Sequence, residues 1–225
     1  MNAYHFIGIG GAGMSVVAEL LAASGADVSG SDSKESATTR RLAAEGISVS
    51  IGHDARHVPA DAVLVVSSAI RESNPELAAA RERSQKVLHR SQALALAARG
   101  RDFVAVAGAH GKTTTSAMIA TALREAGLDP SWAIGGSVVG AGGGSHLGGG
   151  RAFVAEADES DASFLNYEPL VEVVTNVEPD HLDHYGSAEA FEEAFAQFAR
   201  LLKADGALIA CADSPGALRM AVGAI

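Results

Sequence analysis

The sequence contains little or nothing of several features that mark particular classes of protein. It has one cysteine, Cys211, so no disulfide can form within the chain, which fits a reducing cytoplasm. We expect Cys211 to be a small buried apolar residue. No apolar run approaches the ~20 residues that a membrane-spanning helix needs. The chain also enters a predicted strand almost at once, so we expect neither a membrane partner nor a signal peptide.

Basic residues are also scarce, because 17 Lys and Arg stand against 27 Asp and Glu, and the formal net charge is −10. A nucleic-acid partner is therefore not expected, since phosphate backbones are bound by a basic face. Single nucleotides are not excluded, because local loops rather than net charge hold them. The chain is 48% hydrophobic, which is enough for a substantial core.

The apolar pattern predicts an α/β fold in which strands and helices alternate. The run 63–67 is continuously apolar, as in a parallel strand that is covered on both faces. Ser187 can cap a helix whose apolar residues recur at helical spacing. That stripe is formed by Phe191, Phe195, Phe198 and Leu202. The other predicted strands are 4–9, 28–32, 103–107, 152–157, 171–175 and 207–211, and the other predicted helices are 13–24, 35–45, 75–85, 91–98 and 113–126.

A strand, a glycine turn and a helix follow one another twice in the chain. We therefore place a domain boundary near 99–101 and predict two nucleotide-binding domains, 1–99 and 100–225. Each is expected to be open at the carboxyl ends of its strands. Segment 135–150 holds nine glycines in sixteen residues, so little of it can be regular. It is either a mobile connector or a loop that covers a ligand.

The first glycine turn reads Gly8-Ile9-Gly10-Gly11-Ala12-Gly13, which fits G-x-G-x-x-G between a strand and a helix. Such a turn brings the backbone close to a pyrophosphate, which the N–H groups of the helix N-terminus then hold. Asp32 ends the second strand, where an acid can accept hydrogen bonds from a ribose. These features suit NAD, FAD or a UDP-sugar equally. Ser67 and Ser68 follow the third strand at the same edge and would either meet a phosphate or base or cap the next turn.

The second glycine turn is more specific, and its residues are Gly108, Ala109, His110, Gly111, Lys112, Thr113 and Thr114. Backbone N–H groups of such a loop cradle phosphates, the lysine meets the β/γ oxygens, and the first threonine can ligate Mg²⁺. The common P-loop has glycine where this chain has Val106, so the loop is G-x-x-G-K-T. The sequence therefore predicts an ATP site.

Four acidic residues follow the strand at 152–157, namely Glu156, Asp158, Glu159 and Asp161. An isolated acidic loop is usually only solvated. An ATPase, however, needs a carboxylate at a neighbouring strand end to help hold Mg²⁺, and Glu156 lies nearest that end. We expect the histidines at 53, 57, 89, 146 and 184 to lie mostly at the surface.

Three stretches resemble the Mur ligase family, and within it the branch that joins L-alanine to UDP-N-acetylmuramate. They are 5–15, 108–115, and 156–164 together with 175–181, and their order and spacing match the family over essentially the whole chain. The related branch that attaches a whole peptide has a different first turn. Gly-Ile-Gly-Gly-Ala-Gly-Met-Ser at 8–15 therefore favours the alanine-adding branch.

The resemblance implies a Rossmann-like UDP-binding domain followed by an incomplete P-loop-type ATPase domain, with a third domain absent. It implies that the UDP-sugar is held by Gly10, Gly11, Ala12, Gly13, Met14, Ser15, Asp32, Ser67 and Ser68. ATP would be held by the loop 108–114, and Mg²⁺ by Thr113, Glu156 and His181. Lys112, Glu156 and His181 would be the catalytic residues.

Two further expectations come from the same resemblance. Several relatives carry a carbamylated lysine that would fall at or beside Phe195, which lies on an apolar stripe, so we expect Phe195 to be a core residue and no carbamate to form. The family's chains are longer than this one, so we expect the chain alone to be catalytically inert. There are two alternatives to a ligase: a nucleotide-sensing module without chemistry and an NAD-dependent oxidoreductase. The oxidoreductase would leave the second glycine turn and Glu156 unexplained.

Overall fold

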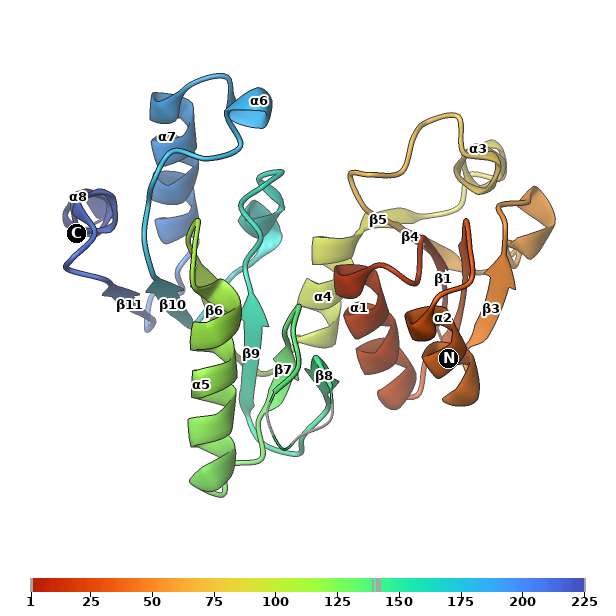
Figure 1. The fold of residues 1–225 in the computed structure, drawn as a ribbon, viewed down its shortest axis with the longest axis horizontal. Helices are drawn as coiled ribbons and strands as arrows, with labels where there is room; N and C mark the ends of the chain where they lie inside the picture. Colours follow the sequence, from red (N-terminus) through yellow and green to blue (C-terminus); the bar gives the residue numbers. More distant parts are fainter. Residues whose placement is uncertain (1, 139, 141–142, 225) are drawn as a thin grey trace. The chain divides into compact units, whose positions relative to one another are not determined.

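The computed structural model describes residues 2–138, 140 and 143–224, and the chain divides into two compact units, Met1–Ala97 and Ala98–Ile225. Each unit is built on its own largely parallel sheet with helices packed against it (Figure 1). The α/β class predicted from the sequence is confirmed. The units divide at 97/98, whereas the predicted boundary lies at 99/100.

The sheet of the first unit has five parallel strands in the order β3-β2-β1-β4-β5. The strands are β1 (Ala3–Ile7), β2 (Asp27–Asp32), β3 (Ser48–Ile51), β4 (Val63–Val66) and β5 (Val87–His89). The order reverses between β1 and β4, so the segments that follow these two strands leave the sheet at its topological switch point, where open α/β sheets bind ligands. The sequence did not predict β3 or β5, which are short edge strands.

The helices of the first unit are α1 (Ala12–Ala23), α2 (Ala37–Ala44), α3 (Pro75–Glu82) and α4 (Arg90–Ala97), with a 3₁₀ turn at Ala55–His57. A core cluster joins Ile7 and Leu64 of the sheet to Leu77 and Ala80 of α3. Helix α1 buries Met14, Val17, Leu20 and Leu21. Burying each large apolar side chain contributes about 1.5–3 kcal/mol, and these contacts hold α1 rigidly behind the first glycine turn.

The sheet of the second unit has six strands in the order β11-β10-β6-β9-β7-β8, parallel except for the pair β7 and β8. The strands are β6 (Asp102–Ala107), β7 (Ser131–Ala133), β8 (Ser145–His146), β9 (Ala152–Glu156), β10 (Val171–Val174) and β11 (Ala207–Ala210). Strand β6 lies between β9 and β10, so the segments that follow these three strands emerge at the same edge. The glycine-rich segment 135–150 contains strand β8; its residues 139, 141 and 142 lie outside the described residues.

The helices of the second unit are α5 (Lys112–Glu125), α6 (Leu182–Tyr185), α7 (Ala188–Ala199) and α8 (Pro215–Ala224), with a 3₁₀ turn at Ser163–Asn166 (Figure 1). Ala120 of α5 packs on Trp132 and Val154 of the sheet. The indole of Trp132, 1% exposed, also stacks on the His146 ring, with the ring centroids 4.4 Å apart.

Helix α7 is capped as predicted, because Ser187 Oγ accepts a hydrogen bond from the Ala190 N–H at 3.2 Å. The predicted apolar stripe is confirmed for its three phenylalanines, whereas its fourth member, Leu202, lies beyond the end of α7 and is half-buried. Phe191, Phe195 and Phe198 are fully buried, and the rings of Phe195 and Phe198 pack on Phe164. Phe195 is therefore a core residue.

Two expectations about individual side chains were wrong. Cys211 is half-buried rather than buried, because it follows the edge strand β11. Three of the five histidines expected at the surface, His53, His57 and His89, are half-buried, while His146 and His184 are exposed. His53 and His57 turn inward toward the buried carboxylate of Glu76, and His89 bonds to Ser91. Within the described residues, none of the helices has the length and apolarity to cross a membrane.

Two buried carboxylates, Glu76 in the first unit and Glu172 in the second, differ in their hydrogen-bond partners. Glu76 of α3 accepts hydrogen bonds from Ser31 Oγ at 2.5 Å and from the Asp54 N–H at 3.1 Å, and it lies 3.5 Å from His5 Nε2. Burial alone would raise the pKa of Glu76, but these partners outweigh it and hold the pKa below its ordinary value. Glu172 of β10 is also fully buried, yet neither carboxylate oxygen has a partner among the described residues. Burial raises the pKa of Glu172 to about 8.

Candidate functional site

The first glycine turn connects β1 to α1 at the switch point of the first sheet. The N–H groups of Gly8 and Ile9 both donate to Ser31 O, at 2.8 and 2.9 Å, so the turn is fixed to β2. Gly8 has φ +78°, a conformation that favours glycine. Gly11 caps α1 without any side-chain hydrogen bond, whereas side chains cap α2, α3 and α7. The first N–H groups of α1 are therefore left to an anion or to water.

Asp32 lies at the end of β2, where the sequence predicted it. Its Oδ2 accepts a hydrogen bond from the Gly10 N–H at 2.9 Å. A Cβ atom added to Gly10 would lie 2.9 Å from both Asp32 Oδ2 and Thr39 Cγ2, so only glycine fits there. One oxygen of Asp32 therefore stabilises the turn. A ribose bound at this edge would bond to the same carboxylate as the Gly10 N–H.

Two other segments approach the first turn. Ser67 is half-buried and Ser68 exposed, and the 67–70 segment meets the turn through Ile70, whose Cδ1 would be 3.5 Å from a Cβ at Gly8. Arg90, the first residue of α4, lies against Gly13, because an added Cβ there would be 2.0 Å from Arg90 Nη1. Sequence reasoning missed Arg90, since its separation of 77 residues from Gly13 gives no local pattern.

The second glycine turn connects β6 to α5. Gly108 has φ +137°, and a Cβ atom added to it would lie 2.1 Å from Thr175 Oγ1. Gly111 has φ +83° and caps α5 without a side-chain hydrogen bond. The backbone conformation of this loop therefore requires both glycines, and the N-terminus of α5 is open to an anion.

Thr175 and Asn176, which follow β10, hold this loop in place, and sequence analysis assigned no role to either residue. Asn176 Oδ1 accepts from the His110 N–H at 3.0 Å, and Asn176 Nδ2 donates to His110 O at 2.9 Å. Thr175 Oγ1 donates to the same oxygen at 2.6 Å. The peptide groups of His110 are therefore held by side chains, which keeps the loop in one conformation.

Lys112 folds back over the loop. Its Nζ donates to Gly108 O and to Glu159 Oε1, each at 2.7 Å. Glu159 is 1% exposed, and burial, only partly offset by Lys112, raises the pKa of its carboxyl group. Within the acidic stretch, the sequence predicted Glu156 as the functional residue. In the structure it is Glu159 that contacts the lysine.

Glu156 and Thr113, two of the three predicted Mg²⁺ ligands, both lie against the Gly135-Gly136 segment. Glu156 Oε1 accepts from the Gly135 N–H at 2.8 Å, and a Cβ at Gly136 would be 2.8 Å from Thr113 Cγ2. A hydroxyl and a carboxylate are oxygen ligands of the kind Mg²⁺ takes, so the pair fits such an ion together with phosphate oxygens and water.

His181, the third predicted ligand, adopts φ +50° immediately before α6. Its N–H donates to Asp180 Oδ1 at 2.7 Å, and its Nε2 lies 3.7 Å from Asp180 Oδ2. Within the part of the chain that the structure describes, no group of three or more His, Cys, Asp or Glu side chains could hold a metal. A Mg²⁺ ion here would depend on its nucleotide for ligands.

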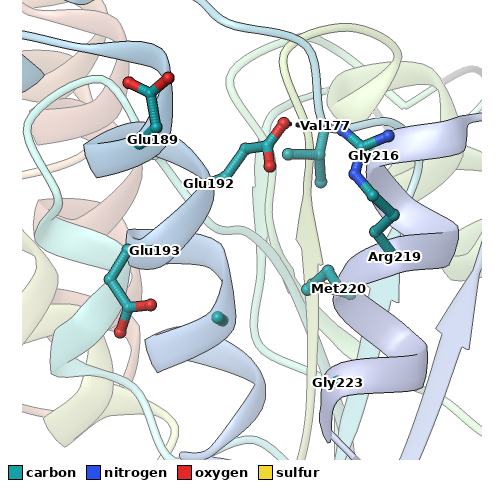
Figure 2. Close-up of a pocket in the computed structure, with 9 residues that line it drawn as sticks. Val177, Glu189, Glu192, Glu193, Gly216, Arg219, Met220 and Gly223 are labelled. Atoms are coloured by element: carbon teal, nitrogen blue, oxygen red, sulfur yellow. Dashed lines mark hydrogen bonds and ion pairs between the residues drawn. The ribbon is translucent and has the colours of Figure 1, made fainter.

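A cavity of about 310 Å³ opens between α7 and α8 (Figure 2). Glu192 and Arg219 face each other across it and form an ion pair at 2.7 Å. None of the predicted site residues lines it. The lining residues are Val177, Glu189, Glu192, Glu193, Ala196, Gly216, Arg219, Met220 and Gly223.

Comparison with known families gives two adjoining matches. Residues 3–102 match the family described as "Mur ligase family, catalytic domain", and residues 106–223 match "Mur ligase middle domain". Among curated proteins, the chain is 59% identical to the UDP-N-acetylmuramate–L-alanine ligase of Renibacterium salmoninarum and 58% identical to that of Kineococcus radiotolerans. Each alignment covers 96% of this chain and 47% of the relative, so the chain spans about half the length of these proteins.

Solved structures show the same relationship. The UDP-N-acetylmuramate-alanine ligase of Thermotoga maritima is 32% identical with a TM-score of 0.88, over 98% of this chain and 51% of that one. The UDP-N-acetylmuramate:L-alanyl-γ-D-glutamyl-meso-diaminopimelate ligase of Neisseria meningitides is 29% identical with a TM-score of 0.90, over 98% of this chain and 74% of that one. The backbone therefore matches both kinds of ligase equally well and does not separate them.

Proposed function

Because this chain belongs to the Mur ligase family, we propose that it provides the UDP-sugar site and part of the ATP site of a ligase. That ligase joins L-alanine to the lactyl carboxylate of UDP-N-acetylmuramate in the synthesis of peptidoglycan precursors. The observation that carries the proposal is the second glycine turn, where Lys112 lies over a loop whose helix N-terminus is open to an anion. The curated relatives, at 59% and 58% identity, favour L-alanine over a peptide as the amine.

Each unit takes one substrate in this proposal. Residues 1–99 form the Rossmann-like domain, and the turn from Gly10 to Ser15, Asp32, Ser67 and Ser68 bind the UDP-sugar. Residues 100–225 form part of the ATP-binding domain, in which the loop 108–114 binds the triphosphate. Thr113, Glu156 and His181 serve the Mg²⁺ ion that accompanies ATP.

The chemistry explains why two nucleotide sites are needed. A carboxylate does not react with an amine, because its charge repels the nucleophile and oxide is a poor leaving group. Transfer of the γ-phosphoryl group to the lactyl carboxylate gives an acyl phosphate, which the amine of L-alanine opens with release of phosphate. Lys112 and the N–H groups of the loop stabilise charge on the phosphate oxygens, and bound Mg²⁺ would neutralise more of it. The protein forms no covalent intermediate.

Ligand-dependent melting of this chain tests the first site. A ligand that binds only the folded state raises the midpoint in proportion to the logarithm of its concentration over its Kd. UDP-N-acetylmuramate should raise the midpoint and NAD should not. A shift with NAD alone would favour an oxidoreductase.

Phosphate release by the full-length parent tests the chemistry. It should require ATP, Mg²⁺, UDP-N-acetylmuramate and L-alanine together. ATP binding without phosphate release under any of these conditions would favour a nucleotide sensor. We also propose a cytoplasmic location, which the single cysteine fits.

A further inference from the structure

Lys112 is held from two sides in the second glycine turn. Its ammonium group has three N–H donors, and two of them reach Gly108 O and Glu159 Oε1. The side chain is 18% exposed, so it lies over the loop rather than in solvent. One donor is left for a phosphate oxygen. A lysine restrained in this way loses less conformational entropy when it binds than a freely rotating one.

Glu159 can restrain Lys112 only if its own position is fixed. Its side chain is buried, and its Oε2 has no hydrogen-bond partner within the described residues. Lys112 is therefore the side chain that bonds to the carboxylate among the described residues, and the position of the Glu159 side chain depends on its backbone. The carbonyl oxygen of Glu159 accepts hydrogen bonds from the Tyr185 hydroxyl and from the Ala162 N–H.

Tyr185 is suited to hold that backbone. Its ring packs edge-on against Phe191, with the centroids 5.1 Å apart. Burial, and then the charge of Glu159, raise the pKa of Tyr185 to about 12, so the hydroxyl remains a donor at any physiological pH. The residue ends α6, which begins directly after His181, and the Tyr185 N–H donates to His181 O at 3.1 Å. Tyr185 therefore links the backbone of His181 to that of Glu159.

The backbone is strained on both sides of this link. Ala162 has φ +57° and His181 has φ +50°, in the left-handed region that residues other than glycine rarely adopt. Such conformations persist where surrounding contacts fix them, and the Tyr185 hydroxyl joins the two strained segments.

We propose that Glu159 and Tyr185 are positioning residues for the triphosphate: Tyr185 fixes Glu159, and Glu159 holds Lys112 over the loop with one N–H free. The inference rests on the proposed function, because it takes the loop 108–114 to be a phosphate site. It adds that phosphate binding at this site depends on Tyr185, which ends the helix that follows His181.

Tyr185→Phe is the sharpest test, because it removes one hydroxyl and changes no charge. Binding of inorganic tripolyphosphate and of ATP with Mg²⁺ to the chain is measured by calorimetry well below the melting midpoint. Both Kd values should rise about fivefold, the usual effect of one neutral hydrogen bond. Tyr4→Phe, a buried tyrosine in the first unit, is the matched control and should leave both unchanged.

Glu159→Asp is the second variant, and it serves if Tyr185→Phe fails to fold. It keeps the negative charge but shortens the side chain by one methylene, so the carboxylate can no longer meet Lys112 at 2.7 Å. Both Kd values should again rise, by about tenfold, because a charged hydrogen bond is stronger than a neutral one. Unchanged or tighter binding in either folded variant would overturn the inference.

A spectroscopic readout separates positioning from a general loss of stability. The ¹⁵N signal of the Lys112 ammonium, assigned by its loss in Lys112→Arg, should be protected from water exchange in the wild type and exposed in Tyr185→Phe. Protection that survives in Tyr185→Phe also overturns the inference. If wild-type protein binds neither tripolyphosphate nor ATP, it is instead the assignment of the phosphate site that fails.

Discussion

The two glycine turns share one topology, yet the charged side chain that bonds to the backbone of the turn is an acid in the first and a cation in the second. In the first, the acid Asp32 accepts a hydrogen bond from the Gly10 N–H at 2.9 Å. Its nearby cation, Arg90, comes from another helix. In the second, the cation Lys112 belongs to the motif itself, and the acid Glu159 comes from another strand end. The first turn is thus arranged around a carboxylate and the second around an ammonium.

In the proposed function, this difference would let one chain distinguish two nucleotides. A carboxylate beside a turn accepts hydrogen bonds from ribose hydroxyls and repels a third phosphate, which suits a diphosphate sugar. A lysine over an open helix N-terminus attracts the most highly charged group available, which is a triphosphate. The substitutions below remove or exchange these features one at a time.

The largest effect is expected from Lys112→Ala, which removes the cation of the second turn. ATP-dependent phosphate release by the full-length parent should fall by about 10³-fold or more, since the charge of the transferred group then lacks its main partner. Binding of the UDP-sugar, measured by calorimetry, should stay within about twofold. Lys203→Ala, an exposed lysine of the same unit, should leave both unchanged. Equal loss of both ligands would contradict the two-site assignment.

Glu156→Ala and His181→Ala should come next. Each should lower turnover at limiting Mg²⁺ by about 10²-fold and weaken nucleotide binding less, because the proposed function assigns both residues to the metal rather than to the loop. The check is a Mg²⁺ titration of phosphate release at fixed ATP. Either variant that keeps wild-type turnover at limiting Mg²⁺ would remove that residue from the site.

Replacing one glycine of each turn by alanine compares how tightly the two turns are constrained. Gly108→Ala should lower the free energy of unfolding by about 3 kcal/mol, because φ is +137° and the added methyl meets Thr175 Oγ1 at 2.1 Å. Gly13→Ala meets only the flexible end of Arg90, so it should cost less than about 1 kcal/mol. Urea unfolding of both variants gives the comparison. Similar losses would mean that the two turns are equally constrained.

The buried acids extend the comparison to the dependence of stability on pH. Glu172 has its folded pKa raised to about 8 from 4.5, so the folded state keeps a proton that the unfolded state releases between these values. Its contribution is fully present below pH 4.5 and is lost at about 1.4 kcal/mol for each pH unit up to 8.

Glu172→Gln should therefore match the wild type near pH 5 and exceed it at pH 8, as measured by urea unfolding. Glu76→Gln is the contrasting variant. Its folded pKa is lowered, so the native carboxylate contributes stability above its unfolded pKa, and the substitution should destabilise the chain at neutral pH. A Glu172→Gln profile parallel to that of the wild type would mean that Glu172 is ionised in the fold.

Elements with a long apolar period could be predicted from the sequence, and short ones could not. The strands around Ile7 and Val106 and the helix after Ser187 were all found. Strands β3, β5 and β7 have only three or four residues, which is too short for a period to be recognised, although β3 does alternate serine with apolar residues as a strand can. Their position is set by the sheet that they join rather than by their own propensity.

The candidate site divides in the same way. Lys112 and Asp32 could be predicted because each stands at a fixed position in its sequence motif. The residues that fasten the second turn lie far away in sequence: Glu159 is 47 residues from Lys112, and Asn176 is 66 from His110. Nor could the sequence show which of Glu156 and Glu159 meets the lysine. The conformation of the chain after β9, in which Ala162 is left-handed, determines which carboxylate reaches Lys112.

The stacked pair of Trp132 and His146 gives the chain an optical signal of its own. Trp132 is the sole tryptophan in the sequence, and its strand leads directly into the segment whose Gly135 N–H binds Glu156. Because the indole is buried and stacked on His146, its emission depends on the packing of the strand that leads to Gly135. A ligand that binds beside Glu156 should change that emission, so binding there could be followed without a label.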